Sequence, residues 1–519
     1  MANYDNVPYP SYCYVNTDPG RMSAIGALFG IDAPAVETAN ILEIGCAAGG
    51  NILPLAARYP NAKFTGVDLS QNQIDTARGK ADSLQLSNIE FDAISIAAHK
   101  FGSEKFDYII AHGVYSWVAS DIQDAILSVC QNHLSDTGLA YISYNTLPGW
   151  NSVKTVRDMM LYHVAKFEDP VMKTKEARGI LTFISENVKS QDSPHKAMLL
   201  KEIKNLQNAD DAYLLHDHLE DINEPCYFHE FMEKATSHDL AYLGDSEPQS
   251  MYLGNQTEEA SKALSQLNDV VSQEQYMDFI TDRRFRSTLL CKKTVTLNRK
   301  LTPQVLDGLH LIPNFTVDIS AEVKPSSPLS ELPLVHMKDE KVKVHLRGQV
   351  ICAGYVKLLQ SLPQHLTVDE VVTDLEEALR QTSKEDIRTE FSGMVLKLIF
   401  GGVLSVSTTP AACAYKITSK PEAFKVARTE AHSKELVPNL LHDVVKLTND
   451  QRLVIQYVTG ENTQADIADK LNHHIAKGDL KLSADGKPMT VDSDALTQHL
   501  PEYVTAQLAF FGNNALLVN

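Results

Sequence analysis

The sequence predicts an α/β protein: a doubly wound sheet in its first third, then a mixed α+β region, then mostly helical units. The chain has 519 residues, enough for about three or four domains of ~150 residues each. Between residues 40 and 148, short apolar runs alternate with helical patterns, which indicates parallel strands joined by helices. Hydrophobic residues make up 44% and charged residues 22%, as in an ordinary globular protein.

The strands of the first region are predicted from apolar runs and the helices from the patterns between them. The predicted strands are 40–45, 63–69, 89–94, 106–112 and 139–145. The predicted helices are 50–58, 71–84 and 121–134. Ligands of such sheets bind at the carboxyl ends of the strands, so the residues that directly follow each strand are the informative ones.

The rest of the chain is expected to form further helical and mixed units. Residues 151–210 have a helical pattern, 323–335 is a Pro/Ser-rich linker candidate, and 407–422 is a second break. Segments 359–375 and 455–471 align without a gap, in the order helix, Thr-capped helix, helix, and a glycine turn into a strand. This order resembles tandem winged-helix-like units, and duplication is one explanation. The predicted domains are 1–205, 206–322, 336–408 and 409–519.

Charge and cysteine usage restrict the partners and the compartment. The net charge of −19 and pI of about 5.4 argue against nucleic acid and favour a basic, lysine-rich partner, although plain solubility also explains them. The seven cysteines are scattered and form no C-x-x-C pair, which predicts free thiols, no metal site and a cytoplasmic location. No secretory signal and no apolar run of 18 residues is found, so no transmembrane segment is expected.

The stretch "ILEIGCAAGGN" ends the first strand with small residues. Small residues let a ligand approach the backbone, and the following helix offers free N–H groups. A dinucleotide fingerprint would need glycine at position 47, where the chain has Ala47, so an NAD enzyme is disfavoured. The order Glu43-x-Gly45-x-x-x-Gly49 is instead the first motif of class I S-adenosylmethionine-dependent methyltransferases. A tight strand-to-helix turn without a ligand is the alternative.

Acidic residues follow the second and third strands. Asp68 lies about twenty residues beyond the glycines, where an acid can accept both ribose hydroxyls. Ser70 is expected to cap the next helix and to leave Asp68 free. Asp92 stands where that class binds the adenine amino group. The predicted cofactor-binding residues are Glu43, Gly45, Cys46, Ala47, Gly49, Asn51, Asp68, Leu69, Asp92, Ala93, His112 and Gly113.

Aromatic residues follow the fourth and fifth strands, in "AHGVYSWV" and "ISYNTLPGW". Both tryptophans of the chain fall there, and aromatic faces favour a cationic ammonium or sulfonium group. Core packing is the alternative for each ring. The predicted catalytic residues are His112, Tyr115, Tyr144 and Asn145. The predicted substrate-binding residues are Tyr115, Trp117 and Trp150.

Several motifs occur together in one bacterial family. They are "YDNVPYPS", "ILEIGCAAGGN", "GVDLS", "FDYIIAHGVYSWV", "YISYNTLPGW" and "HDHLEDINEPCYFHEF". Over about 1–300 the chain resembles class I methyltransferases that carry a methyltransferase regulatory domain, among them the rickettsial protein-lysine methyltransferases that modify outer membrane proteins. The chain departs from the family pattern at Ala47 and at "TDPGR", which replaces Thr-His-Pro-Asp-Arg.

The resemblance implies a Rossmann-like catalytic domain, S-adenosylmethionine as cofactor and a lysine-rich protein substrate such as an outer membrane protein. It places a regulatory segment at about 214–300. A neutral amine would attack the methyl group without a metal, and His112 or Tyr144 would relay the proton. Small-molecule N- or O-methyltransferases and a non-catalytic binding protein are the rivals. The N-terminal tyrosines are expected to form a lid or to pack on the surface: Tyr4, Tyr9, Tyr12 and Tyr14.

Overall fold

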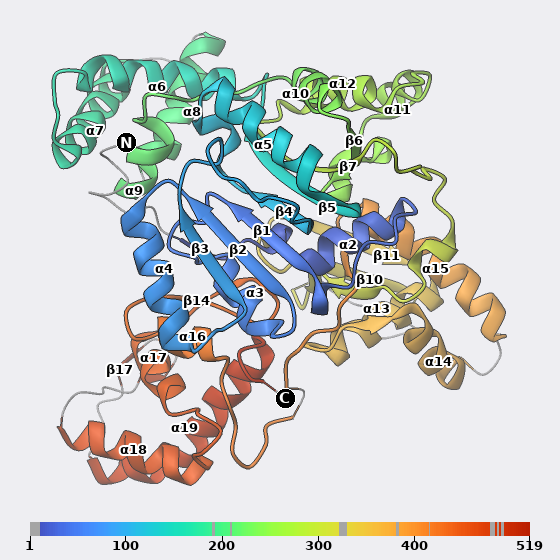
Figure 1. The fold of residues 1–519 in the computed structure, drawn as a ribbon. Coiled ribbons are helices and arrows are strands. Elements are labelled where there is room, and N and C mark those ends of the chain that lie inside the picture. The colour runs from blue at the N-terminus through green and yellow to red at the C-terminus, as the bar shows by residue number, and fades with distance from the viewer. Residues whose placement is uncertain are drawn as a thin grey trace.

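A large mixed sheet stands at the centre of the molecule, with a helical lobe at the top left of Figure 1 and the C-terminal units at the bottom and right. This is seen in a computed structural model. It describes residues 11–188, 193–207, 210–320, 330–379, 383–414, 416–477, 483–484, 487–488 and 493–518. Tyr4 and Tyr9, two residues of the predicted lid, lie outside the described residues.

The large sheet has seven strands in the order β3-β2-β1-β4-β5-β7-β6. The first five are parallel, and β7 is antiparallel to both of its neighbours. The strands are β1 Asn40–Ile44, β2 Lys63–Asp68, β3 Ile89–Ala93, β4 Phe106–Ala111, β5 Leu134–Asn145, β6 Leu240–Asp245 and β7 Phe285–Lys292. The five strands predicted from the sequence are confirmed, and β5 begins earlier than predicted.

Helices on both faces of this sheet bury its apolar side chains. The helices are α2 Pro19–Leu28, α3 Ile52–Arg58, α4 Gln71–Leu84 and α5 Ser120–His133. β1 is buried on both faces because it lies between β2 and β4, as expected for a central parallel strand. Ser70 caps α4, since its Oγ accepts the Gln73 N–H (3.3 Å), so the predicted cap is confirmed.

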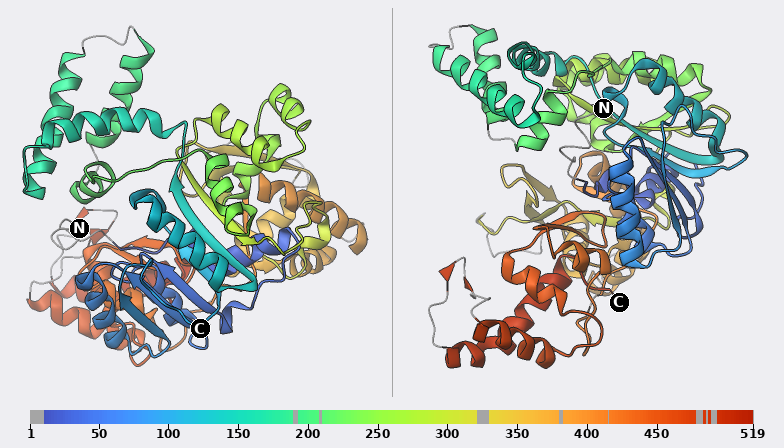
Figure 2. Two further views of the ribbon diagram at one scale, coloured as in Figure 1. Left: turned by 45° about the horizontal axis from the view of Figure 1, so that its top comes forward. Right: turned by 60° about the vertical axis from the view of Figure 1, so that its left-hand side comes forward.

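The last two strands of the sheet come from the middle region of the chain. A helical lobe separates them from β5 (Figure 2). This lobe consists of α6 Trp150–Val164, α7 Pro170–Asn187 and α8 Pro194–Gln207, and its helices confirm the pattern seen at 151–210. The helices near β6 and β7 are α9 Asp211–Tyr213, α10 Phe228–Ser237, α11 Glu258–Leu264 and α12 Val270–Thr281.

A buried ionic cluster fixes α12 to β7. The Arg286 side chain is fully buried and donates to both Asp278 oxygens at 2.8 Å and to Glu274 Oε2 at 3.0 Å. Its guanidinium also lies 3.7 Å from the Phe228 ring centroid. Because buried charges are costly unless paired, this cluster couples the middle region to the sheet.

The C-terminal part contains two winged-helix-like units. The first has α13 Gln349–Ser361, α14 Val368–Ala378 and α15 Lys384–Phe400, with a sheet in the order β12-β8-β13 of Leu366–Thr367, His310–Pro313 and Leu404–Ser407. A second small sheet, β9-β10-β11, is formed by Phe315–Val317, Glu331–His336 and Lys343–Arg347. Residues 331–335 are therefore a strand, and the linker prediction is wrong there because apolar residues of that stretch are buried.

The second unit has α16 Lys425–Glu430, α17 Asn449–Gln456, α18 Gln464–Lys477 and α19 Ser493–Asn513, with β14 Leu436–Pro438, β15 Val444–Lys446, β16 Ser483–Ala484 and β17 Lys487–Pro488. Both predicted threonine caps are present: Thr367 accepts from the Glu370 N–H and Thr463 from the Asp466 N–H. The duplication and the four domain limits stay predictions. Pairing of β8 and β9 with later strands crosses the limit drawn at 322.

The structure bears on two further predictions, the free thiols and the absence of a membrane-spanning helix. All seven cysteines are free thiols, which confirms that expectation. Within the part of the chain that the structure describes, no helix is long and apolar enough to span a bilayer.

Candidate active site

The glycine turn after β1 has a backbone that few side chains tolerate. Gly45, Ala47 and Gly49 have φ values of +74°, +46° and +75°. The N–H groups of Gly45 and Cys46 donate to Val67 O at 2.7 and 3.2 Å, which ties the turn to β2. A Cβ on Gly45 would lie 2.3 Å from a methyl group of Val114. The turn therefore needs small residues for steric reasons.

Asn51, at the start of α3, joins the turn to distant parts of the chain. Its Nδ2 donates to Glu43 Oε1 at 2.8 Å, and burial raises the pKa of Glu43 to about 8. Its Oδ1 accepts the Tyr14 N–H (3.0 Å) and the Thr17 hydroxyl (2.9 Å). His442 Nε2 lies 2.8 Å from the same oxygen and must carry the proton. The C-terminal unit thus contributes a side chain to the glycine turn, which the sequence analysis missed.

Asp68 and Asp92 end adjacent strands at the same edge as the turn. Asp68 Oδ2 accepts the Ala47 N–H and Oδ1 accepts the Ser70 N–H, both at 2.9 Å. The expectation that Ser70 leaves Asp68 free is therefore wrong, because the backbone at residue 70 also needs an acceptor. Asp92 is exposed, with Oδ2 2.9 Å from His99 Nε2.

The residues of this edge fit an adenosyl cofactor. Leu69 and Ile94 are apolar but 55% and 36% exposed, which offers apolar surface to an adenine ring beside Asp68 and Asp92. Gly113 is exposed, and a Cβ there would meet nothing within 4 Å, so space is open in front of β4. Ile94 was not among the predicted residues. An exposed apolar residue directly after a strand end was the signal for it.

His112 lies at the end of β4, under the N-terminal segment. Its Nδ1 is 3.0 Å from the Tyr141 hydroxyl and 3.3 Å from the Ser143 hydroxyl. The Tyr14 ring centroid is 3.9 Å from that of His112. Burial lowers the pKa of His112 to about 4. At neutral pH the imidazole is therefore neutral and a weak base, which counts against the predicted proton relay.

Tyr115 and Tyr144 point into the core, not toward the strand edge. Both side chains are about 1% exposed. Their ring centroids lie 5.2 and 4.2 Å from that of Phe231 in α10. The Tyr144 hydroxyl is 3.0 Å from Thr288 Oγ1, and burial raises its pKa well above the usual value. Because the buried Tyr144 hydroxyl already has a hydrogen-bond partner, the structure favours core packing over the predicted catalytic role for this ring, and both rings pack against Phe231.

The two tryptophans do come together. Trp117 and Trp150 meet edge to face, with ring centroids 6.3 Å apart and planes at 82°. Asn145 lies beside them at the end of β5, with its N–H donating to Ser116 Oγ at 2.9 Å. Among the described residues, the buried Asn145 Nδ2 and Trp150 Nε1 atoms have no hydrogen-bond partner. The residues that follow β4 and β5 thus form an aromatic cluster that contains polar atoms without a hydrogen-bond partner among the described residues.

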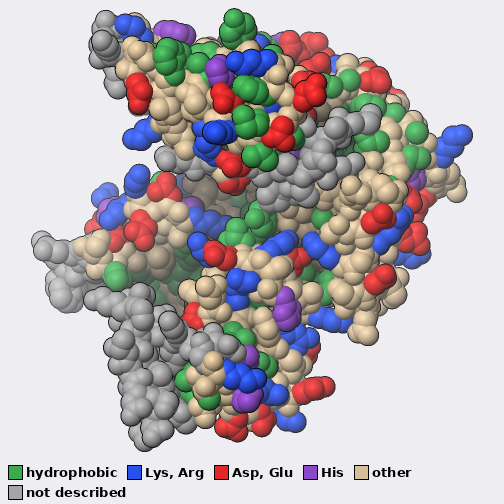
Figure 3. Space-filling model, turned by 90° about the vertical axis from the view of Figure 1, so that its left-hand side faces the viewer, with side chains coloured by type: hydrophobic (Ala, Val, Ile, Leu, Met, Phe, Trp, Pro, Cys, Tyr) green, Lys and Arg blue, Asp and Glu red, His purple; other side chains and the backbone are tan. Residues whose placement is uncertain are grey.

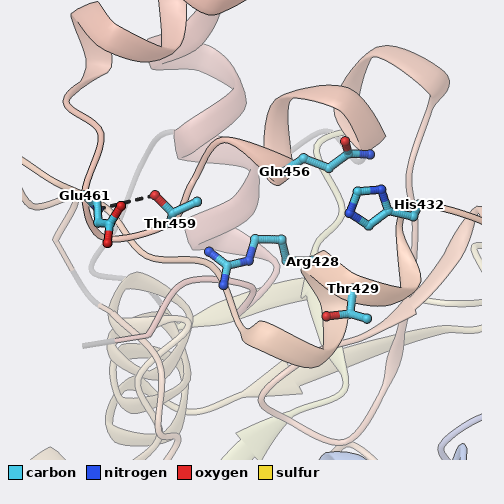
Figure 4. Close-up of a pocket in the computed structure, with 6 residues that line it drawn as sticks. All are labelled: Arg428, Thr429, His432, Gln456, Thr459 and Glu461. Carbon is cyan, nitrogen blue, oxygen red and sulfur yellow. Dashed lines mark hydrogen bonds between the residues drawn. The ribbon is translucent and has the colours of Figure 1, made fainter. Parts of the chain in front are cut away.

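The molecule is hollowed on the side of this edge. Figure 3 shows the recess between the helical lobe at the top and the parts below it. A separate pocket of about 380 Å³ lies in the second C-terminal unit. In Figure 4 the Arg428 side chain lies between His432 on one side and Glu461 with Thr459 on the other. That pocket shares no residue with the strand edge.

The chain is similar to known methyltransferases in sequence and in structure. A model described as "Methyltransferase domain" matches residues 41–138, "Predicted methyltransferase regulatory domain" matches 210–292, and "PKMT, C-terminal winged helix domain" matches 419–516. PKMT2 from Rickettsia typhi, solved in complex with AdoHcy, is 32% identical, with 99% of this chain and 100% of that chain covered and a TM-score of 0.89. The chain belongs to this methyltransferase family. An uncharacterized protein of Rickettsia prowazekii is 38% identical over 99% of this chain and 93% of its own length.

The protein is thus an S-adenosylmethionine-dependent methyltransferase with a Rossmann-like core, a regulatory segment and a C-terminal winged helix. β6 and β7 both lie within the residues that match the regulatory domain. That segment therefore completes the sheet of the methyltransferase and is not a separate appendage.

Proposed function

We propose that this methyltransferase transfers methyl groups to lysine side-chain amines of a protein. The observation that carries the proposal is the meeting of Trp117 and Trp150 beside the strand edge that fits the cofactor. A cation near an aromatic face gains roughly 0.5–2 kcal/mol, which suits a lysine ammonium group. The recess in Figure 3 lies at the surface of the molecule, where a protein substrate can reach it. The name PKMT2 of the Rickettsia typhi relative supports a protein-lysine substrate.

The cofactor side of the reaction is assigned to the strand ends. S-adenosylmethionine supplies an activated methyl group when it is bound. We assign the glycine turn to its methionine part, Asp68 to the ribose hydroxyls, and Asp92 with Leu69 and Ile94 to the adenine ring. A charge-assisted hydrogen bond of this kind is worth roughly 1.5–3 kcal/mol. Glu43, Cys46, Ala47, Gly49, Asn51, Ala93, His112 and Gly113 complete the lining.

The transfer is an in-line displacement. A proton first passes from the lysine ammonium to water. The lone pair of the neutral amine would then form a bond to the methyl carbon, and the carbon–sulfur bond would break with its electron pair going to sulfur. A free lysine has a pKa of about 10.4, so roughly one amine in a few thousand is neutral at pH 7. The tryptophan faces attract the ammonium form, and the sulfonium charge of a bound cofactor together with desolvation at the reacting end favours the neutral amine. Alignment of the reactants makes the largest contribution to lowering the activation barrier, about 7–11 kcal/mol.

The partner is proposed to be basic. The net charge of −19 attracts a lysine-rich protein and speeds its association at low salt. An outer membrane protein that is methylated before export fits this description. The seven free thiols support a reducing, cytoplasmic compartment for the enzyme.

Mass spectrometry tests the proposal. A panel of lysine-rich proteins is incubated with the enzyme and S-adenosylmethionine, beside the same panel with its amines acetylated. We expect +14 mass steps on lysines of the untreated panel only. Mass steps on the acetylated panel, or turnover only with small amines or acids, would contradict a lysine substrate and favour a small-molecule enzyme. Cofactor binding without any turnover would favour a non-catalytic protein.

A further inference from the structure

A π-helical turn in the regulatory segment packs against Trp150, the tryptophan that starts α6. It spans Leu214–His218 and directly follows α9. The His218 ring is stacked parallel to that of Trp150, with planes at 6° and centroids 6.4 Å apart, and Tyr213 meets it from the side at 5.2 Å. π-helical turns are rare and frequently lie at functional sites. The turn therefore extends the aromatic cluster that Trp117 and Trp150 begin.

His218 is buried without a hydrogen-bond partner. Its side chain is 2% exposed, and among the described residues neither ring nitrogen has a partner. Burial, with a smaller effect from the Arg157 charge, lowers the pKa of His218 to about 4. The neutral ring has one N–H donor and one acceptor nitrogen, and each buried polar atom left unpaired costs about 1–3 kcal/mol. Native structures rarely retain such atoms unless something binds to them.

Further unpaired polar atoms surround the same place. They are Trp150 Nε1, Asn145 Nδ2 and both amide atoms of Asn223. Asn223 is held near the strand ends, because the next residue, Glu224, donates its N–H to Ser116 O at 2.8 Å. The unpaired atoms thus come from the end of β5, the start of α6 and the loop after the π-helical turn.

Asp217, the residue before His218, acts on the charge state of the N-terminal segment. Burial, with a smaller effect from the Asp217 charge, raises the pKa of Tyr14 to about 12. The Tyr14 ring in turn lies 3.9 Å from the His112 ring, measured between centroids.

We propose that His218 binds the amine of the acceptor lysine, with the rings of Trp117 and Trp150 alongside it. This inference rests on the proposed function. A lysine ammonium has three donors and no acceptor, and the free ring nitrogen of His218 and the Asn223 carbonyl oxygen are acceptors without donors. The aromatic faces stabilise the cation and outweigh the opposing charge of Arg157, which acts on His218 only as a smaller effect than burial. The regulatory segment thus supplies a substrate-binding residue.

Intrinsic fluorescence tests this directly, because both tryptophans of the chain are in the subsite. The full-length protein, saturated with S-adenosylhomocysteine, is titrated with Nα-acetyl-lysine methylamide. The matched ligand is Nα-acetyl-norleucine methylamide, which has a similar length and no amine. We expect a saturable change with the lysine compound only. An equal response to both compounds, or none to either, would overturn the inference.

Two variants separate a binding role from a structural one. His218→Phe retains the ring stack and removes both nitrogens. His365→Phe is the control, because His365 is 5% exposed, has an unpaired Nε2 and lies in the first C-terminal unit. For His218→Phe we expect affinity for the lysine compound to fall, and KM for the protein substrate to rise, at least about tenfold. Affinity for S-adenosylhomocysteine should stay within about twofold, and His365→Phe should match the wild type.

Different results would contradict the role of His218 and the proposed lysine methylation. A wild type that methylates lysines while His218→Phe retains its KM within about twofold would overturn the role of His218 alone. A wild type that leaves every lysine unmodified would remove the proposed function itself. If His218→Phe does not fold, His218→Leu, which removes both ring nitrogens with a smaller side chain, takes its place in the same comparison with the wild type.

Discussion

Replacing Gly45 by alanine should damage both the fold and cofactor binding. The φ of +74° at Gly45 costs an alanine about 1–2 kcal/mol. Its Cβ would also lie 2.3 Å from Val114, and such overpacking costs about 1–3 kcal/mol. We expect a loss of about 2–5 kcal/mol in the free energy of unfolding. Because the turn must shift to relieve the clash, affinity for S-adenosylhomocysteine should fall at least about tenfold.

Gly79→Ala is the matched control. Gly79 lies inside α4, and a Cβ there would meet nothing within 4 Å. Alanine at a helical position should therefore stabilise the protein by about 0.5–1 kcal/mol and leave binding unchanged. Urea denaturation and calorimetric titration measure the two quantities. A Gly45→Ala protein as stable as Gly79→Ala, with wild-type affinity, would refute the steric account of the turn.

Three further predictions concern the cofactor edge, the ionic cluster and acid. Asp68→Ala should weaken S-adenosylhomocysteine binding at least about tenfold in calorimetry. Unchanged affinity would contradict the assignment of Asp68 to the ribose hydroxyls. Arg286→Met leaves buried acids unpaired and should lower the free energy of unfolding by about 3–5 kcal/mol, measured by urea denaturation. Arg347→Met, at an exposed ion pair, is the control and should lower it by less than about 1 kcal/mol. Equal losses in the two variants would contradict a stabilising role of the cluster. Stability should fall from pH 6.5 toward pH 4, on the order of 1 kcal/mol per pH unit for each of the buried histidines His112, His218, His365 and His442, because only the unfolded state takes up the proton there. Glu43, Glu247, Glu274 and Asp278, whose pKa values are raised, oppose this change. The test is therefore a comparison of variants: His365→Phe should lose less stability than the wild type between pH 7.5 and pH 5, and an equal loss would contradict the burial of His365.

The central sheet was predictable because its signals are local. Each of the first five strands is a short apolar run between helical patterns, so hydrophobic spacing alone identifies it. β6 and β7 follow a long helical insertion, and their pairing with β5 is a non-local property. Nothing in residues 240–292 taken alone indicates which sheet they join.

The residues of the candidate site could be predicted where they directly follow a predicted strand, and not where they come from distant segments. The glycine turn, Asp68, Asp92 and the two tryptophans follow strands that the sequence reveals. Strand alternation explains the error at Tyr144, because successive side chains point to opposite faces, and it is Tyr141 and Ser143 that approach His112. His442 contacts Asn51 across 391 residues, a distance at which local patterns carry no information.

A crystal structure of this protein with S-adenosylhomocysteine would test the central claim most directly, because it shows whether cofactor and acceptor sites share one edge. The account predicts the homocysteine part against the turn at Gly45 and the ribose hydroxyls on Asp68. It also predicts the sulfur facing the space beside Trp117, Trp150 and His218. Binding elsewhere, or a sulfur turned away from the tryptophans, would contradict it.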